Sequence, residues 1–544
     1  MGPSGGPITK DNTSVEYYGT IFAVAESPHE RGVIYAGSDD GLLHLTRDGG
    51  ATWTNVTPKG APQWIMWNAV DVSPFDRGTA YVAGTQYKSD DFRPYLYRTT
   101  DYGATWTKIT TGIANEHFTR VVRSDKRRKG LLYAGTERGM YVSFDDGASW
   151  QSLQLNLPIV PVTDLAVRDD DLIAATQGRS FWMLDDLSPL QQLAPEVTAK
   201  RAHLFAPRAA WRTSGSVSAR TVNAGTNAPG GVIVNYWIKP DVKTGTPVKL
   251  AFLGADGSVI RELTGEVKPP AAKVEPAPQG EPPPAEPAKK IGVRSEGGEQ
   301  EAKTPPSEPE EKDPKAEKEK ERNKLPDSTT GFNRYVWDLR YPEAKKFEGL
   351  VLWGGGTDGP RVPPGAYSVR LTVGEESMTV PAQLKQDPRS SATQAGLQSQ
   401  FEFVLAANRK LSEIHEQIER IREVRAQLKD LRTRLGKEES GKPIVEAAKE
   451  LDKKMTAAEE ALYQTRNRSS QDPLNFPIRL NDKLASVAES AALGDFAPTA
   501  QHRAVYAELA QQIDAQLAQL RTVWETDLPA LNALVKTSEV AAVK

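Results

Sequence analysis

One short pattern occurs three times before residue 151 and constrains the fold of this chain more than any other feature. It places Ser or Thr, Asp, Gly and Trp at fixed spacing, as S/T-x-D-x-G-x-x-W. The Asp can accept hydrogen bonds from turn amides, the Gly adopts a backbone conformation that other residues resist, and the Trp can pack beneath the turn. The pattern predicts three hairpin turns of one design. Its positions are Thr46, Asp48, Gly50, Trp53, Thr99, Asp101, Gly103, Trp106, Ser143, Asp145, Gly147 and Trp150.

Apolar, strand-like runs recur ahead of these turns. The small residues near the ends of these runs lie 47, 51 and 40 residues apart. This interval is typical of one four-stranded blade of a β-propeller. We therefore predict about four blades within residues 1–195, the last without the turn pattern. The runs are VIYAGS (33–38), AYVAGT (80–85), LLYAGT (131–136) and DLIAAT (171–176).

The sequence changes character after the repeats. Between residues 200 and 388, apolar and polar residues alternate in runs bounded by Gly and Pro turns, which predicts an antiparallel β-sandwich similar to fibronectin III or immunoglobulin-like modules. Residues 267–328 interrupt it with a Pro-, Glu- and Lys-rich segment that contains no aromatic residue. Such a segment buries too little apolar area to offset its ordering entropy, so we predict disorder. The strands on both sides are expected to share one core.

The C-terminal part, 392–544, carries apolar residues at helical spacing. Four helices with short links predict an antiparallel bundle. The first helix has a heptad seam, so self-association through a coiled coil is the alternative to packing within one chain. The seam contains Leu411, Ile414, Ile418, Ile421, Val424, Leu428, Leu431 and Leu435.

The three tryptophan-ended turns match the Asp-box of the BNR-repeat families, which include sialidases, xyloglucan-cleaving propeller glycosidases, sortilin-type receptors and photosystem II assembly factors. With the sandwich and helices, the chain resembles large bacterial exported proteins described as glycosyl hydrolase-like, sortilin N-terminal-like or WD40/YVTN/BNR repeat-like. Propellers of these families usually have six or more blades. The resemblance implies the C-terminal portion of an exported, periplasmic or extracellular protein, although the sequence shows no signal peptide. A complete four-bladed ring is the alternative.

Composition excludes several classes of site. The chain has no cysteine, which removes disulfides and thiolate metal sites, and its six histidines show no ligand spacing. We therefore expect no metal and no cofactor. Lys and Arg number 68 against 71 Asp and Glu, so there is no overall basic charge to attract nucleic acid. No apolar run approaches the ~20 residues of a membrane span.

Catalytic candidates are weakly indicated. A sialidase needs an arginine cluster, a Tyr–Glu pair and an acid, but the spacing of the available residues does not predict that they converge. Acidic pairs recur at similar places in the repeat, which indicates turn chemistry. The candidates are Glu16 beside Tyr17 and Tyr18, and Arg120, Arg123 and Arg138.

The best ligand-contact candidates are Trp64 and Trp67, which precede an inner strand and lie outside the Asp-box positions. We therefore expect a non-catalytic exported propeller protein that binds a protein or glycan. A propeller-type glycoside hydrolase, sialidase- or xyloglucanase-like, and an assembly factor for protein complexes are the alternatives. No catalytic residue is assigned.

Overall fold

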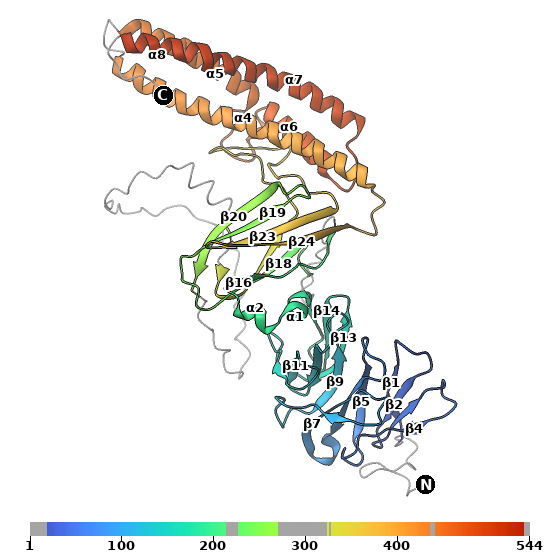
Figure 1. Ribbon diagram of the computed structural model, residues 1–544. Coiled ribbons are helices and arrows are strands. Elements are labelled where there is room, and N and C mark those ends of the chain that lie inside the picture. The colour runs from blue at the N-terminus through green and yellow to red at the C-terminus, as the bar shows by residue number, and fades with distance from the viewer. Residues whose placement is uncertain (1–18, 214–226, 270–323, 326–327, 436–440, 538–544) are drawn as a thin grey trace, which may run out of the picture. The chain divides into compact units, whose positions relative to one another are not determined.

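The computed structural model describes residues 19–213, 227–269, 324–325, 328–435 and 441–537 (Figure 1). Within these ranges the protein is mainly β, with several small antiparallel sheets, and ends in a helical region. The chain divides into two compact units, Met1–Ala194 and Pro195–Lys544. The regions predicted as sandwich and bundle therefore belong to one unit.

The first unit contains four sheets that follow one another along the chain. The first three have four strands and the last has three, and in every sheet each strand pairs antiparallel with the next strand in sequence. The strands are β1 (Ile21–Glu26), β2 (Ile34–Ser38), β3 (Leu43–Thr46), β4 (Thr54–Asn55); β5 (Met66–Val72), β6 (Ala80–Gln86), β7 (Asp91–Thr99), β8 (Thr107–Lys108); β9 (Thr119–Ser124), β10 (Leu132–Thr136), β11 (Gly139–Ser143), β12 (Gln151–Ser152); and β13 (Val162–Arg168), β14 (Asp171–Thr176), β15 (Phe181–Leu184).

Successive sheets pack through their first strands. β1 contacts β5, β5 contacts β9, and β9 contacts β13. Apolar side chains of the first two sheets form one cluster that includes Tyr35, Val70 and Val82, and a second cluster joins the second, third and fourth sheets. Short antiparallel sheets that pack by their innermost strands are the local arrangement of β-propeller blades. The fold is therefore propeller-like.

Each Asp-box turn is held by the same set of hydrogen bonds. In the second sheet, the Thr99 hydroxyl donates to Asp101 Oδ1 at 2.8 Å and accepts from the Gly103 amide at 2.8 Å. Asp101 also accepts from the amide and the hydroxyl of Thr105, at 2.9 and 2.6 Å. The first and third turns repeat these bonds around Asp48 and Asp145. The motif glycine has a φ of +82°, which favours glycine there.

The same turn also closes against the first hairpin of its own sheet. The amide of Tyr102 donates to the carbonyl of Gly78 at 2.9 Å, and the equivalent pairs are Gly49 to Gly32 and Asp146 to Gly130. The turn between the third and fourth strands therefore lies at the same end of the sheet as the turn between the first and second. The turn between the second and third strands lies at the opposite end.

Two of the three motif tryptophans tie one sheet to the sheet before it. The indole N–H of Trp106 donates to the carbonyl of Val56 at 2.7 Å, and that of Trp150 donates to the carbonyl of Ile109 at 2.8 Å. Both acceptors follow the last strand of the preceding sheet. Trp53 is 46% exposed and makes no hydrogen bond to a described residue. The Asp-box therefore fastens its own turn and holds neighbouring sheets together.

The second unit begins with a two-sheet sandwich. One sheet has the order β16-β18-β22 and the other β17-β24-β23-β19-β20-β21. Side chains of both sheets meet in one core, where Trp337 stacks on Phe252 with ring centroids 4.7 Å apart. The strands are β16 (Ala202–Leu204), β17 (Ala210–Arg212), β18 (Val232–Ile238), β19 (Pro247–Leu253), β20 (Val259–Lys268), β21 (Ser328–Thr329), β22 (Gly331–Trp337), β23 (Gly365–Val373) and β24 (Glu376–Gln386).

The predicted disordered segment interrupts this sandwich. Most of 267–328 lies outside the described residues, so its disorder stays a prediction. Its flanks are described: Val267 and Lys268 pair in parallel with Ser328 and Thr329. Val267 and Trp337 belong to the same apolar core. The strands before and after the segment therefore share one core, because neither sheet buries its inner face without the other.

The helical region contains α4 (Gln394–Leu435), α5 (Lys442–Leu462), α6 (Leu480–Ala492), α7 (Ala500–Thr522) and α8 (Leu528–Thr537). A π-helical turn at Val523–Asp527 joins the last two helices. The heptad seam of α4 is buried in one core with side chains of the other helices, including Leu451, Ile513 and Leu531. The seam therefore packs within the chain, and self-association through it remains a proposal.

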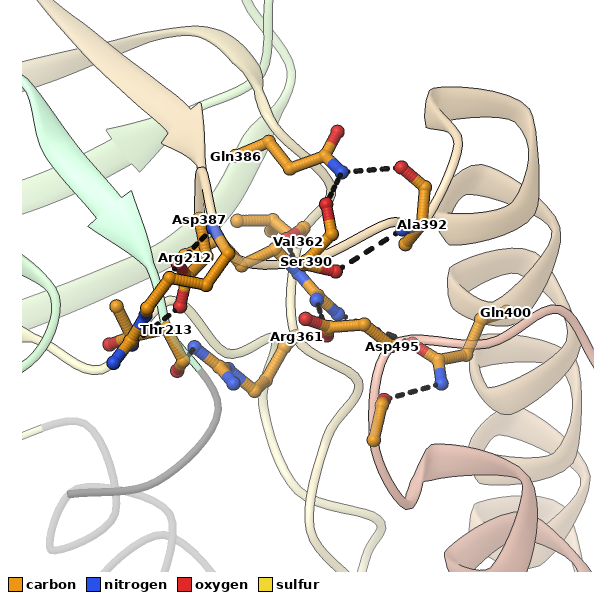
Figure 2. A network of polar contacts seen from close by, with 12 residues as sticks. Arg212, Thr213, Arg361, Val362, Gln386, Asp387, Ser390, Ala392, Gln400 and Asp495 are labelled. Carbon is orange, nitrogen blue, oxygen red and sulfur yellow. Dashed lines mark hydrogen bonds and ion pairs between the residues drawn. The ribbon is translucent and has the colours of Figure 1, made fainter. Parts of the chain in front are cut away.

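A buried arginine joins the sandwich to the helices (Figure 2). Arg212, at the end of β17 and only 4% exposed, forms an ion pair with Asp495, which follows α6. Its Nε donates to the carbonyl of Val362 at 3.1 Å, and its Nη2 donates to Gln400 Oε1 of α4 at 3.2 Å. Gln400 in turn donates to the carbonyl of Gly494 at 3.0 Å. The guanidinium group is therefore satisfied from three segments that are distant in sequence.

We predict that Trp150→Phe lowers the free energy of unfolding by about 2–3 kcal/mol, because it leaves the carbonyl of Ile109 unpaired in a buried site. Trp53→Phe should change it by less than about 0.5 kcal/mol, because that ring is half exposed. Urea unfolding followed by far-UV circular dichroism measures the total effect, and hydrogen exchange localises it to β9–β12. Equal effects of the two substitutions would contradict the inter-sheet role of Trp150.

We also predict that Arg212→Ala costs about 3–5 kcal/mol, because the carboxylate of Asp495 is left nearly buried without a partner. The double variant Arg212→Ala/Asp495→Ala should cost less than the sum of the single changes. Thermal and urea unfolding measure both. Arg434→Ala is the control, since Arg434 and Asp430 are both exposed on α4 and the loss of their ion pair should have little effect. Additive single effects would rule out the coupling.

Candidate functional site

Trp67, one of the two predicted ligand contacts, is a packing residue. It is fully buried at the start of β5, and its indole N–H donates to the carbonyl of Gly41 at 3.1 Å. Its ring meets Tyr97 edge-on, and a Cβ added at Gly37 would lie 2.7 Å from its own Cβ. A ligand contact at Trp67 would require this core to open. Both tryptophans were predicted to lie just before an inner strand, but Trp67 lies within β5 and only Trp64 lies in the loop before it.

Trp64 lies in that loop and is half-buried. Its φ is +65°, a conformation that non-glycine residues rarely adopt and that often occurs at binding loops. It lines a pocket with Asp39, Gln86 and Lys88, but the room inside is about 10 Å³, enough for one water molecule. Trp64 therefore remains a predicted contact at the edge of a wider surface.

That surface contains an aromatic–arginine cluster, formed by Tyr87, Phe92, Phe118, Arg120 and Glu137. Tyr87 stacks on Phe118 with centroids 5.1 Å apart, and Phe92 packs against Phe118 at 6.1 Å while 46% exposed. The guanidinium of Arg120 lies over Phe118, 5.1 Å from its centroid. Glu137 pairs with this guanidinium at 2.7 Å, which fixes its orientation.

The cluster lies at the end of the sheets opposite the Asp-box turns. Tyr87 belongs to a short 3-10 turn, Tyr87–Ser89, between the second and third strands of the second sheet. Phe118 immediately precedes β9, and Glu137 lies in the turn between β10 and β11 of the third sheet. Two sheets therefore supply one cluster, in which Phe92 is exposed, Phe118 is buried and the other three side chains are partly buried. The sequence pattern did not predict this cluster, although the segment between AYVAGT and YLYRTT is longer than its counterparts and contains Tyr87 and Phe92.

The carboxylate of Asp91, which precedes Phe92 in the chain, is held in its ionised form. Hydrogen bonds from Arg93, at 2.7 Å to Oδ2, hold the pKa of the Asp91 carboxyl well below its usual range, and the Tyr95 hydroxyl donates to the same oxygen at 2.6 Å. The ammonium of Lys108 lies 4.5 Å from the Tyr95 ring centroid. A glycosidase needs a carboxylic acid whose pKa is raised. Asp91 has the opposite shift and cannot supply that acid near neutral pH.

His117 lies beside the cluster and is held neutral. Burial lowers its pKa below 6.5, and the positive charge of Arg138 lowers it further. Its Nδ1 lies 2.8 Å from the hydroxyl of Tyr141. A neutral imidazole can accept the tyrosine proton in this hydrogen bond, which protonated histidine cannot do through that nitrogen.

Two of the three arginines considered for a sialidase site are paired with different carboxylates. Arg120 pairs with Glu137, whereas Arg123 pairs with Asp164 of the fourth sheet at 2.7 Å. Glu16, Tyr17 and Tyr18 lie outside the described residues. Within the described ranges, no group of three or more His, Asp or Glu side chains is placed to hold a metal ion. No helix in this part of the chain is long and apolar enough to cross a membrane.

No protein-family model and no curated protein sequence matches the chain. Among solved structures, "YCF48 bound to D1 peptide" is 22% identical over 30% of this chain and 50% of its own, with a TM-score of 0.25. YCF48 from Cyanidioschyzon merolae is 21% identical over 30% of this chain and 52% of its own, also at 0.25. A GH74 xyloglucanase from Xanthomonas campestris is 16% identical over 46% and 36%, at 0.26. The chain thus spans about half or less of these proteins, and similarities of this size assign no family.

We predict that Arg138→Gln raises the pKa of His117 toward 6.5, because it removes a nearby positive charge and leaves burial unchanged. The increase should shrink as salt is added, since Arg138 is exposed. A titration of the histidine ring nitrogens by NMR measures it. An unchanged pKa at low salt would show that burial alone sets the value.

Proposed function

We propose that this chain is a non-catalytic, propeller-type binding protein and that its aromatic–arginine cluster contacts a protein partner. The observation that carries the proposal is a half-exposed Phe92 beside a guanidinium that an ion pair and two rings hold in place. Aromatic and arginine side chains dominate the binding energy of protein interfaces. Because Arg120 is already oriented by Glu137, it loses little rotamer freedom on binding.

The position of the cluster also supports this proposal. It lies at the end of the sheets where one sheet connects to the next, and the Asp-box turns close the other end. In β proteins, binding surfaces usually lie on loops that a rigid scaffold positions. Trp64 and Lys88 extend the same surface and would widen the contact.

Hydrolysis of a glycan is the less favoured function. It requires a general acid with a raised pKa near a second carboxylate. Beside the cluster, Asp91 carries the opposite shift, and Glu137 is engaged by Arg120. A role as an assembly factor would use the same protein-binding surface and is not distinguished from the first proposal by these contacts. Export and continuation of the propeller beyond these four sheets are further proposals that rest on the Asp-box resemblance.

Peptides selected from a phage-displayed library on the whole chain test the proposal. We expect Phe92→Ala to weaken their binding about tenfold or more, which corresponds to ~1.4 kcal/mol or more at a hot spot. Phe181→Ala is the matched control, because Phe181 is an exposed phenylalanine on β15, outside the cluster. Fluorescence polarisation gives the Kd values, and thermal unfolding verifies that both variants fold.

Equal binding by wild type and Phe92→Ala would overturn the proposed surface. A separate assay measures release of reducing sugar from a panel of polysaccharides. Release that disappears in Glu137→Gln would replace the binding function with the glycoside hydrolase alternative.

A further inference from the structure

The second unit has an open cavity of about 380 Å³ between α4, the end of α5 with the segment after it, and the loop that joins β22 to β23. Arg422 and Arg425 of α4 line it, together with Glu459 and Tyr463 at the end of α5 and with Asn467 and Arg468 beyond it. The volume is within the range of small-molecule sites in proteins. None of these residues takes part in the function proposed above.

Arg425 and Glu459 form an ion pair in the wall of the cavity. Arg425 donates Nε to Asp452 at 2.9 Å, Nη1 to Glu459 at 2.6 Å and Nη2 to Thr456 at 3.0 Å, so each nitrogen of its guanidinium makes a hydrogen bond. Glu459 is only 3% exposed and also accepts from Arg422 Nε at 3.0 Å. The buried carboxylate is therefore compensated by two arginines, and Arg425 acts as a support for the wall.

Arg422 and Arg468 keep unused donors. Arg422 directs Nε to Glu459 and Nη1 to the carbonyl of Glu348, and its plane lies over Phe347, 4.6 Å from the centroid. Its Nη2 has no hydrogen bond to a described residue. Arg468 uses Nη1 for the carbonyls of Thr465 and Asn467 and forms no ion pair with a described residue. Glu348 and Glu459 are the carboxylates of the lining, and Asp452 pairs with Arg425 beside it, so the feature that points to an anion is the pair of unused guanidinium donors rather than net charge.

The two arginines approach the same point from different segments. Burial raises the pKa of the Tyr463 phenol, and the positive charges of Arg422 and Arg468 both act in the opposite direction. The phenol itself is fixed, because it donates to the carbonyl of Gly349 at 2.9 Å. Asn467 is buried, and its side-chain oxygen accepts no hydrogen bond from the described residues. Such an atom normally has a partner in a water molecule or ligand.

We propose that this cavity binds the oxyanion group of a small solute, a carboxylate or a phosphate, through Arg468 and the free Nη2 of Arg422. Guanidinium groups bind both anions through paired N–H donors in a fixed geometry. The aromatic rings beside Arg422 hold its plane in place, so little side-chain entropy is lost on binding. The remaining room accommodates a body of monosaccharide or amino-acid size, whose donor groups would meet the amide oxygen of Asn467.

Isothermal titration of the whole chain with inorganic phosphate, glucuronate and glucose tests this site. We expect saturable binding of at least one anion and none of glucose, and the anion that binds identifies the group. Arg468→Gln should weaken that binding at least fivefold and Arg468→Lys by less. Arg468 is exposed, so both variants should fold, which thermal unfolding verifies.

Arg434→Gln is the matched control, because Arg434 lies on the last turn of α4 in an exposed pair with Asp430 and outside the cavity. Its affinity for the anion should equal that of the wild type. Absence of saturable binding to both anions, or equal affinity in Arg468→Gln and wild type, would overturn the proposal.

Discussion

The first unit depends on one repeated contact, in which the indole N–H of an Asp-box tryptophan donates to a backbone carbonyl of the preceding sheet. A four-stranded sheet of this size cannot bury its faces alone, so its stability comes from its neighbours. Trp106 and Trp150 make this contact at 2.7 and 2.8 Å, at the point where the motif glycines allow close approach. The Asp carboxylates stabilise the turns themselves. Hydrogen bonds from Thr52 lower the pKa of Asp48 to about 2. These turns therefore lose their stabilisation only in strong acid, as the pH falls from about 4 toward 2.

In the second unit, the main contact of this kind joins a sheet of the sandwich to the helical region. The two surfaces meet through a nearly buried guanidinium, Arg212, whose bonds come from Val362, Gln400 and Asp495. A buried charge of this kind contributes less net stability than an apolar contact of the same size, but it tolerates only one geometry. The sandwich and the helices therefore form one compact unit, although their sequence patterns differ completely.

Arginine beside an aromatic ring occurs at both proposed binding surfaces. At the aromatic–arginine cluster, Arg120 is fixed by Glu137 and offers a flat, rigid surface next to an exposed phenylalanine, which suits a protein segment. In the cavity of the second unit, Arg422 is held over Phe347 but keeps free donors next to Arg468, which suits an anion. Both guanidinium groups pair with a carboxylate, and the difference lies in their neighbours: aromatic rings surround Arg120, whereas a second arginine, Arg468, lies near Arg422.

The sequence by itself determined the elements that follow local rules. The tryptophan-ended turns, the strand runs before them, the alternating β-region within 200–388 and the long helix with the heptad seam were predicted, because turn chemistry and apolar periodicity act over a few residues. The short strands β16 and β17 and the π-helical turn were not, since they exist through pairing or packing with distant segments. The sequence did not predict the sites for the same reason, because packing between distant segments forms them. The residue type of Trp67 suggested a ligand contact, but Gly37 of the neighbouring sheet leaves room for its side chain in the core. Only the tertiary structure brings Tyr87, Phe118 and Glu137 together, because they come from different turns of two sheets.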